Sequence, residues 1–237
     1  MNSAGIYLVD LYVNGVETPV IVDDWIPTKY GRPAFASSGE DELWVCLLEK
    51  AWAKLHGSYM ATEGGLPTMA STHLSGVPSY DLEHSEISGD VDGFWARLCR
   101  ADKHNFTIMS ATHGQGENVD ASGIVSGHAY SLISVHQIDT ESGPVRLCKL
   151  RNPWGSGEWK GDWSDESELW TPELREQVGC LEADDGIFHM TVEDYVQQYE
   201  STSFCVEHSE VEYKHSISEV NFKKRESAFY EFELPED

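Results

Sequence analysis

The sequence predicts an α+β fold, with strands forming a sheet and helices packed at its edge. Two apolar runs have the two-residue alternation of half-buried strands, one around residues 127–135 and the next ending at residues 151–155. Two other segments, residues 44–55 and 92–102, repeat apolar residues at helical spacing. The 237 residues are 40% hydrophobic and include eight Trp, so the chain is long and apolar enough to bury a core.

A β-hairpin is predicted at the start of the chain. Residues 6–13 and 19–22 are apolar runs that flank Asn14 and Gly15. This pair tolerates the positive φ angles of a tight turn, so the two runs are expected to be antiparallel neighbours.

The first helix is predicted over residues 44–55. Ser38 and Asp41 form a plausible capping box before it, and Gly57 is expected to end it. This assignment places Cys46 about two turns inside the helix, away from the positive N-terminal end that lowers a thiol pKa. We therefore interpret Cys46 as a packing residue and not as a nucleophile.

The middle of the chain is predicted to contain two loops and a second helix. Residues 64–79 are rich in Gly, Ser, Thr and Pro, which predicts a loop that either borders a cleft or only connects elements. The helix over residues 92–102 is followed by a short strand at residues 106–109. Residues 113–126 form either a mobile rim of the site or a plain surface loop.

His128 and Asn152 are the candidate catalytic residues, because each lies at the end of a predicted strand where the two side chains could meet. Imidazole can accept a proton near neutral pH, and an Asn carbonyl oxygen can orient the ring. The pair suits a general base and its orienting group in a thiol-nucleophile site. The alternative is a core His and a turn Asn. On the first strand one face is predicted to carry Ala129, Ser131, Ile133 and Val135, and the other His128, Tyr130, Leu132 and Ser134.

Three short segments of the sequence around these residues resemble the His and Asn segments of calpains, in the same order and at similar separation. They are Gly-His-Ala-Tyr-Ser at residues 127–131, Arg-Asn-Pro-Trp-Gly at residues 151–155 and Glu-Trp-Lys-Gly-Asp-Trp-Ser-Asp at residues 158–165. The resemblance extends back through residues 47–59 and forward to residues 184–190, and it covers roughly residues 5–207.

The resemblance implies the C-terminal half of a calpain-type, papain-like protease core, whose second lobe is a twisted antiparallel sheet or half-barrel with flanking helices. His128 would be the base and Asn152 its orienting residue. The backbone at Gly127 would hold substrate main chain, and Trp154 would shield the pair and obstruct closure of the two halves without calcium. Trp154, Trp159 and Trp163 follow Asn152 closely and could equally be core residues.

The calpain nucleophile lies in a Gly-Asp-Cys-Trp segment of the preceding half, and this sequence contains no such segment. The chain alone is therefore expected to be inactive, while a parent protein with the Cys-bearing lobe would cleave internal peptide bonds of protein substrates. The alternative is a non-catalytic calpain-like binding or scaffold module, a pseudoprotease. The retained His128 and Asn152 argue against it, whereas Ile187 and His189, which depart from the calpain pattern, allow it.

The resemblance also implies a calcium site. Glu158 and Asp165 would supply carboxylates from one loop, and a second loop would add the Ala183 carbonyl and the Asp185 carboxylate. Ile187 replaces an acid of the family, which removes oxygens from a cation that takes six to eight, so the affinity should fall or vanish. Without the resemblance, these residues are scattered surface acids.

Charge and cysteine content limit the partners. The formal net charge of −25 disfavours nucleic acid and anionic lipid, and the excess acids either solubilise the protein or bind divalent cations. Five Cys without paired spacing favour a reduced, cytoplasmic protein. No apolar run approaches the length of a membrane helix, and the N-terminus lacks the pattern of a signal peptide, so neither insertion nor secretion is indicated.

The domain boundary is predicted near Glu207. Thr191 and Asp194 cap a last helix that runs to Tyr199, and a final strand follows at residues 204–206. Residues 1–207 are assigned to the His- and Asn-bearing subdomain. Residues 208–237 would be a linker, a truncated start of a β-sandwich domain, or a solvated extension.

Overall fold

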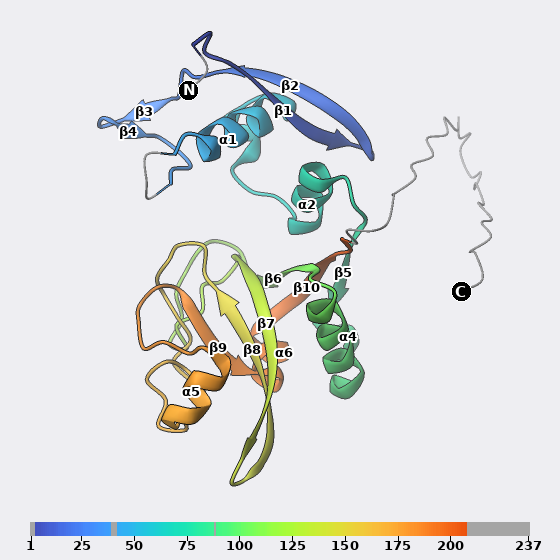
Figure 1. Ribbon diagram of the computed structural model, residues 1–237, viewed down its shortest axis with the longest axis vertical. Coiled ribbons are helices and arrows are strands. Elements are labelled where there is room, and N and C mark those ends of the chain that lie inside the picture. Colours follow the sequence, from blue (N-terminus) through green and yellow to red (C-terminus); the bar gives the residue numbers. More distant parts are fainter. Residues whose placement is uncertain (1–2, 39–41, 88, 208–237) are drawn as a thin grey trace, which may run out of the picture.

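The computed structural model describes residues 3–38, 42–87 and 89–207, so the tail at residues 208–237 lies outside the described residues. A six-stranded sheet forms the larger part of the molecule, and a hairpin with a helix forms a smaller part above it in Figure 1. All five pairings in the sheet are antiparallel, and the sheet does not close on itself. The predicted α+β class with an antiparallel sheet is confirmed.

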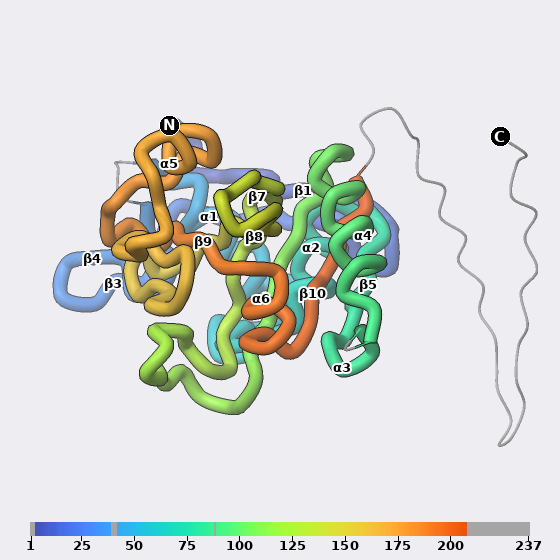
Figure 2. The backbone as a smooth tube through the Cα atoms, turned by 90° about the horizontal axis from the view of Figure 1, so that it is seen from below, coloured from blue at the N-terminus to red at the C-terminus, as the bar shows by residue number. Residues whose placement is uncertain are grey.

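The sheet has the strand order β5-β10-β6-β7-β8-β9. The strands are β5 (Ser79–Glu83), β6 (Thr107–Thr112), β7 (Ala129–Thr140), β8 (Gly143–Arg151), β9 (Ile187–Thr191) and β10 (Tyr199–Cys205). The helices beside it are α3 (His84–Ile87), α4 (Val91–Lys103), α5 (Pro172–Val178) and α6 (Val192–Gln198). Figures 1 and 2 show α4 and α5 at opposite ends of the sheet.

The main hydrophobic core joins α4 and α6 to the sheet. Phe94 and Leu98 of α4 and Tyr195 of α6 pack with Phe188 and Phe204 from the strands, and each is at most 2% exposed. A smaller cluster lies beneath α5 and contains Ile138, Leu147, Trp163, Trp170, Val178 and Cys180. The predicted helix over residues 92–102 therefore exists, with the expected buried face.

The predicted N-terminal hairpin is also present, formed by β1 (Ile6–Val13) and β2 (Val16–Asp23). Its turn residues Asn14 and Gly15 have φ angles of 51° and 76°. The hairpin packs on α1 (Trp44–Leu55) through a separate cluster formed by Leu11, Val20, Val22, Leu47 and Ala51. The remaining short elements of this part are β3 (Thr28–Lys29), β4 (Arg32–Pro33) and η1 (Tyr59–Thr62).

The predicted capping box of α1 is wrong. The helix begins after Leu43, which makes no side-chain cap, and the Ser38 hydroxyl donates instead to the Glu42 carbonyl at 3.1 Å. A cap must directly precede the first helical residue, and Ser38 lies too far upstream to serve as one.

Cys46 consequently lies in the first turn of α1, not two turns inside it. Its side chain is nevertheless 4% exposed, and its thiol donates to the Ala36 carbonyl at 3.2 Å. This environment suits a packing role.

The segment predicted as a loop at residues 64–79 contains a helix, α2 (Pro67–Ser75). Pro67 occupies the first turn, where a missing N–H costs nothing, and Gly76 ends the helix at a φ of 75°. The Ser71 and Ser75 hydroxyls donate to carbonyls one turn earlier, at 3.0 and 2.7 Å. These bonds pair the Ser hydroxyls with carbonyls of the same helix, so residues that are typical of loops are accommodated within α2.

The predicted alternation along β7 holds only for its first half. A β-bulge shifts the register between Leu132 and Ser134, so that Ile133 is 45% exposed while Val135 is 9% exposed. Strict alternation predicts that Ile133 and Val135 share one face, and this prediction is wrong because the extra residue of a bulge reverses the faces that follow it.

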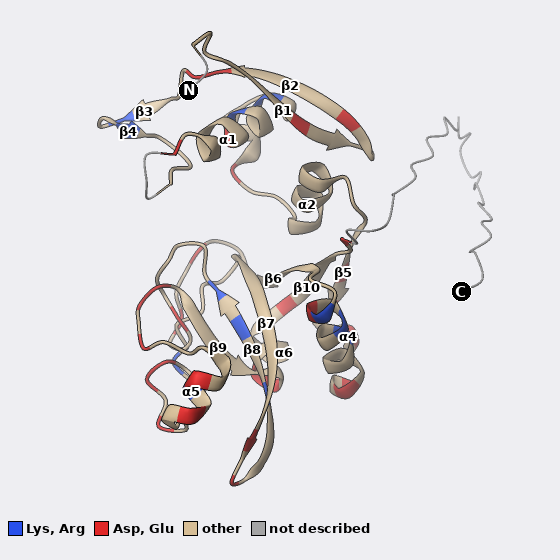
Figure 3. Cartoon of the chain, viewed as in Figure 1, with Lys and Arg blue, Asp and Glu red and all other residues tan. Residues whose placement is uncertain are grey.

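Within the part of the chain that the structure describes, no helix combines the length and apolar character that crossing a bilayer requires. Acidic residues are spread over both parts of the molecule, including α5 (Figure 3).

Candidate active site

His128 and Asn152 meet where β7 begins and β8 ends. Residue pairs Ser131↔Arg151 and Leu132↔Leu150 place these strand ends side by side. The His128 Nε2 atom lies 3.0 Å from Asn152 Oδ1, so the proximity expected from the sequence is present.

Two strands away from Asn152, Thr112 of β6 fixes the backbone of His128. The Thr112 amide donates to the His128 carbonyl at 3.0 Å, and the Thr112 hydroxyl oxygen accepts from the His128 amide at 2.9 Å. These bonds hold the backbone of His128 next to the start of β7, where the strand ends meet.

The Asn152 side chain has one allowed orientation. It is fully buried, and its Nδ2 group donates to the Ser156 and Gly157 carbonyls at 2.8 and 3.1 Å. Its Oδ1 atom accepts from the Trp154 amide at 3.1 Å. Because Oδ1 can only accept, the Nε2 atom of His128 must carry a proton. In the neutral ring, Nδ1 is then the nitrogen that can take a proton from a nucleophile.

That nitrogen is already in contact with Glu117. Glu117 lies in the loop at residues 113–126, and its Oε1 atom is 3.0 Å from His128 Nδ1. A carboxylate and a bare imidazole nitrogen are both acceptors, so this bond requires a proton and is an ion pair when the ring is charged. The His128 side chain is 8% exposed and that of Glu117 is 55% exposed. The loop therefore borders the site and occupies the position where a thiol would approach.

Aromatic rings flank the imidazole. Tyr130 lies edge-on, with ring centroids 5.2 Å apart, and Trp154 lies tilted at 4.7 Å. Trp154 is 48% exposed, whereas Trp159 and Trp163 are buried in the two cores. Of the three Trp that the sequence placed near Asn152, only Trp154 stands against His128.

Gly127 is the point where the loop packs against the strand. Its φ is 58°, and a Cβ built there would lie 3.1 Å from the Gly116 amide nitrogen and 3.2 Å from the Gly114 carbonyl oxygen. The Gly127 amide donates to the His113 carbonyl at 3.0 Å. In this structure the missing side chain of Gly127 lets the backbone of residues 114–116 approach closely.

The residues expected to bind calcium lie in two adjacent loops. Glu158 and Asp165 line a surface pocket of about 960 Å³. Glu158 Oε1 accepts from the Asp185 and Gly186 amides at 3.0 and 2.7 Å, and Asp165 Oδ2 accepts from the Ala183 amide at 3.4 Å. These bonds tie the second loop to the first.

Burial is the main cause that raises the pKa values of both acids. It raises the pKa of Glu158, and with the charge of Asp185 it raises that of Asp165 to about 6. Carboxylates whose charged forms are disfavoured in this way are partners for a cation.

The fit to calcium is partial. Two carboxylates face one pocket, but the Ala183 carbonyl accepts from the Asp185 amide, and Asp185 Oδ1 accepts from the Ile187 amide. Ile187 itself offers no oxygen from its side chain.

A second group of potential ligands was not foreseen from the sequence. Asp165, Cys180 and His189 are all buried, and their donor atoms lie within 4.8 Å of one another. The available signal was the His at position 189, which breaks an otherwise apolar strand sequence, but no spacing links it to Cys180.

Comparisons with known proteins agree with the geometry at the strand ends. The sequence model of a family described as "Calpain family cysteine protease" matches residues 1–206. The calpain-type cysteine protease DEK1 of Arabidopsis thaliana is 38% identical over 213 residues, covering 86% of this chain and 10% of that protein. Human calpain-14 is 37% identical over 208 residues, covering 85% of this chain and 30% of that protein. The calpain-1 catalytic subunit of Rattus norvegicus is 35% identical, with 85% and 29% covered. The chain thus spans about a tenth of the plant relative and under a third of the animal ones.

Proposed function

Because this chain belongs to the calpain family of cysteine proteases, we propose that it is the His- and Asn-bearing half of a calpain-type cysteine endopeptidase. The observation that carries the proposal is the 3.0 Å contact between His128 Nε2 and Asn152 Oδ1. Three further hydrogen bonds of the Asn152 side-chain amide, to Ser156, Gly157 and Trp154, hold it in place. Such a pair has no use without a nucleophile, so a Cys-bearing lobe is the partner it requires.

The chemistry proposed for this half is proton transfer. His128 Nδ1 takes the proton of the partner lobe's thiol, and the thiolate attacks the carbonyl carbon of the scissile peptide bond. The C–N bond breaks as His128 returns the proton to the leaving amine. Water, deprotonated by the same nitrogen, then cleaves the thioester and regenerates the thiol. Asn152 holds the ring throughout, and Trp154 limits access of water to the His128 to Asn152 bond.

Glu117 must leave His128 before this chemistry begins, because one nitrogen cannot serve both a carboxylate and a thiol. The loop at residues 113–126 is therefore proposed to move when the two lobes join. Without the partner lobe the chain is expected to be inactive, and with it the substrates are proteins cleaved at internal peptide bonds.

The test is reconstitution. The chain is mixed with a calpain lobe that carries the catalytic Cys, and cleavage of a fluorogenic peptide is measured with and without a thiol alkylating agent. We expect thiol-dependent cleavage that His128→Ala abolishes. His104→Ala, an exposed His at the end of α4, is the matched control and should retain activity. If the His128→Ala chain mixed with the Cys-bearing lobe cleaves the peptide at the wild-type rate, the proposal is refuted.

A pseudoprotease is the second candidate, and the Glu117 contact favours it because the reactive nitrogen is already occupied. In that case the chain would be a calpain-like binding or scaffold module. The discriminating observation is the residue at the nucleophile position in the gene that encodes the chain, since Ser or Gly there removes the thiol.

Calcium binding is proposed as a weak accessory property, carried by Glu158 and Asp165 with Ala183 and Asp185. It is supported by two carboxylates in one pocket and weakened by Ile187. Calcium should raise the melting temperature by mass action. Glu158→Gln should remove that rise.

A cytoplasmic location belongs to the same proposal and is supported by five free thiols.

A further inference from the structure

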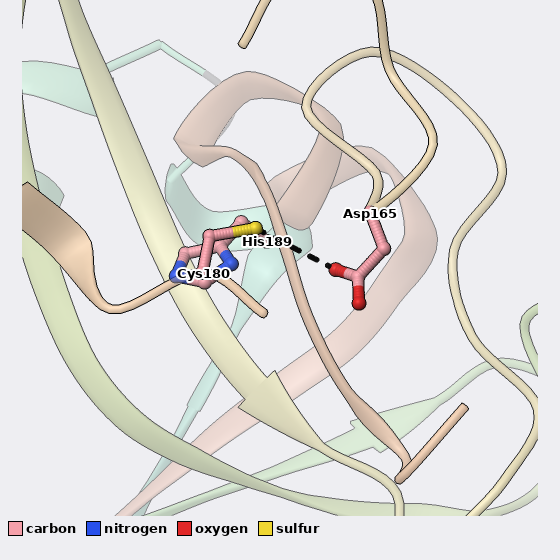
Figure 4. A group of neighbouring side chains, drawn as sticks. All are labelled: Asp165, Cys180 and His189. Atoms are coloured by element: carbon pink, nitrogen blue, oxygen red, sulfur yellow. Dashed lines mark hydrogen bonds between the residues drawn. The ribbon is translucent and has the colours of Figure 1, made fainter. Parts of the chain in front are cut away.

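We propose that Asp165, Cys180 and His189 form a binding site for a borderline-soft divalent transition metal, with zinc as the best-matched ion (Figure 4). The three residues come from separate segments: the loop after β8, the turn after α5, and strand β9. The three residues are 7%, 6% and 1% exposed, respectively. Carboxylate, thiolate and imidazole together are donors that zinc accepts in proteins. This site is independent of the proposed protease function.

The strongest indication comes from His189. Both of its ring nitrogens are buried and neither has a hydrogen-bond partner. The ring packs edge-on against Trp170 at 5.5 Å and lies 6.3 Å from the His136 ring. Burial lowers the pKa of His189. The Val178 carbonyl near the ring acts against this shift, but it makes no hydrogen bond to either ring nitrogen. Buried polar atoms normally find partners, and a metal ion would give one nitrogen the partner it lacks.

The positions of the other two donors suit a shared ion. Cys180 Sγ lies 3.8 Å from Asp165 Oδ1. Ligands of one tetrahedral zinc ion, bonded at 2.0 to 2.3 Å, lie about 3.5 Å apart. No two of the three donor atoms lie more than 4.8 Å apart, so displacements of the side-chain donors by about 1 Å would complete the geometry. Three protein ligands leave a fourth position for water.

Nearby positive charges must be accounted for. Arg175 Nη1 donates to Cys180 Sγ at 3.4 Å, and Nη2 donates to the Asp165 carbonyl at 2.6 Å. Lys149 Nζ donates to the Gly179 carbonyl at 3.0 Å. A thiolate and a carboxylate carry two negative charges, which balance the ion, and the guanidinium then serves as an outer hydrogen-bond donor that orients the sulfur. Arg175 thus holds two of the three ligand residues in place.

The cluster should discriminate against calcium, although it shares Asp165 with the proposed calcium donors. Calcium is a hard ion that takes six to eight oxygen ligands, and this group offers one sulfur and one nitrogen. Zinc and calcium would therefore bind on two sides of one carboxylate, and occupation of one site should weaken the other.

The test uses the full 237-residue chain, stripped with a chelator and kept reduced. Zinc affinity is measured by competition with a chromophoric chelator, and cobalt is used as a spectroscopic substitute. We expect one equivalent of tight zinc and a thiolate-to-cobalt charge-transfer band. Cys180→Ala should remove the band and lower zinc affinity by about 100-fold or more, since even outer partners of ligands are worth 10- to 100-fold. Cys99→Ser, which changes a half-buried thiol outside the cluster, is the matched control and should retain both.

A second pair of variants separates the two cation sites. Glu158→Gln should abolish calcium-induced stabilisation and leave zinc affinity unchanged, whereas Asp165→Asn should weaken both. The proposal is overturned if wild-type protein gives no charge-transfer band with cobalt. It is also overturned if Glu158→Gln reduces zinc affinity as much as Cys180→Ala does, because zinc would then be bound in the carboxylate pocket. The wild-type spectrum decides even if a buried variant fails to fold.

Discussion

The two ring nitrogens of His128 have different partners, and the difference determines what the site can do. Asn152 Oδ1 accepts from His128 Nε2. The Asn152 amide cannot flip by 180°, because its Nδ2 group donates to the Ser156 and Gly157 carbonyls. Nδ1 is bound by a half-exposed carboxylate on a loop. One contact is permanent within the fold, and the other can be broken. The orientation of the base is built in, while its availability depends on Glu117.

Replacing Glu117 with Gln should increase the activity of the reconstituted protease. An ion pair whose carboxylate is half-exposed is worth about 1 kcal/mol, and loss of that amount raises the fraction of free imidazole by about fivefold. The measurement is the cleavage rate of a fluorogenic peptide at saturating partner lobe, and it should rise roughly two- to fivefold. Glu141→Gln, which removes an exposed charge at the β7 to β8 turn, should leave the rate unchanged. A lower rate in Glu117→Gln would mean that the carboxylate assists the base and does not block it.

His84 predicts how stability depends on pH. Its ring is 3% exposed, and its Nε2 atom lies 2.7 Å from the Thr202 hydroxyl oxygen. Burial lowers its pKa from 6.5 to about 4, with the charge of His113 acting in the same direction and the Val196 and Tyr199 carbonyls opposing. The unfolded chain therefore binds the proton more tightly. The stability that comes from His84 is complete above pH 6.5 and is lost as the pH falls toward 4.

The expected loss is about 3 kcal/mol, since one unit of pKa is worth 1.36 kcal/mol. Between pH 7.5 and 4.5, urea unfolding of the wild type should contain a His84 contribution of about 2.5 kcal/mol, because folded His84 is still mostly neutral at pH 4.5. In His84→Gln, the part of the difference that comes from His84 should vanish, whereas His104→Ala should retain it. Equal slopes in wild type and His84→Gln would show that His84 is not the titrating group.

The sequence was informative about the two site residues that lie at the ends of consecutive strands. His128 and Asn152 lie at ends of adjacent strands, so alternation and order along the chain bring them together. Glu117, Cys180 and His189 reach their partners through loop conformations and long-range packing, which no local periodicity encodes. Loop geometry is set by tertiary contacts, and for this reason the sequence could not reveal them.

At the scale of elements, strong periodicity was sufficient. The β1 to β2 hairpin and α4 were predicted from turn residues and helical spacing, and both exist. The α2 helix was missed because its Ser and Thr residues are typical of loops, although Pro67 and Gly76 mark its ends. The bulge in β7 was missed because an inserted residue leaves the apolar content of the strand unchanged.

Gly76 provides a test of how α2 is held. Its φ is 75°, and an added Cβ would lie 2.6 Å from the Tyr12 ring of β1. Gly31 has a φ of 77° with nothing within 4 Å of its Cβ position. Gly31→Ala should therefore cost only backbone strain, about 1 to 2 kcal/mol. Gly76→Ala should cost that strain plus the displacement of Tyr12, for a total of about 2 to 5 kcal/mol.

Urea unfolding monitored by circular dichroism measures both values. Equal losses in the two variants would show that Tyr12 yields without cost, and that α2 is not tightly seated on the hairpin.

At the scale of the whole molecule, the two parts differ in how much apolar surface supports them. Of the residues that the structure describes, twenty are buried in the main core and five in the cluster between the hairpin and α1. Contacts between the parts run largely through α2, which touches β1 on one side and β5 and β10 on the other. A part with a small core and one bridging helix should open more readily than the sheet.

Among the elements that the structure describes, hydrogen exchange should therefore be fastest in the N-terminal hairpin and α1. Amides of β1, β2 and α1 are expected to have protection factors lower by about tenfold or more than those of β7 and β8, because local opening there exposes less buried surface. Gly76→Ala should widen the gap by loosening α2 from β1, and Gly31→Ala should not affect the α2 contact. Mass spectrometry of proteolytic fragments resolves these segments. If all of these elements have the same protection factor in the wild type, they open as a single cooperative unit. The contacts of α2 would then be strong enough to prevent separate opening of the N-terminal part.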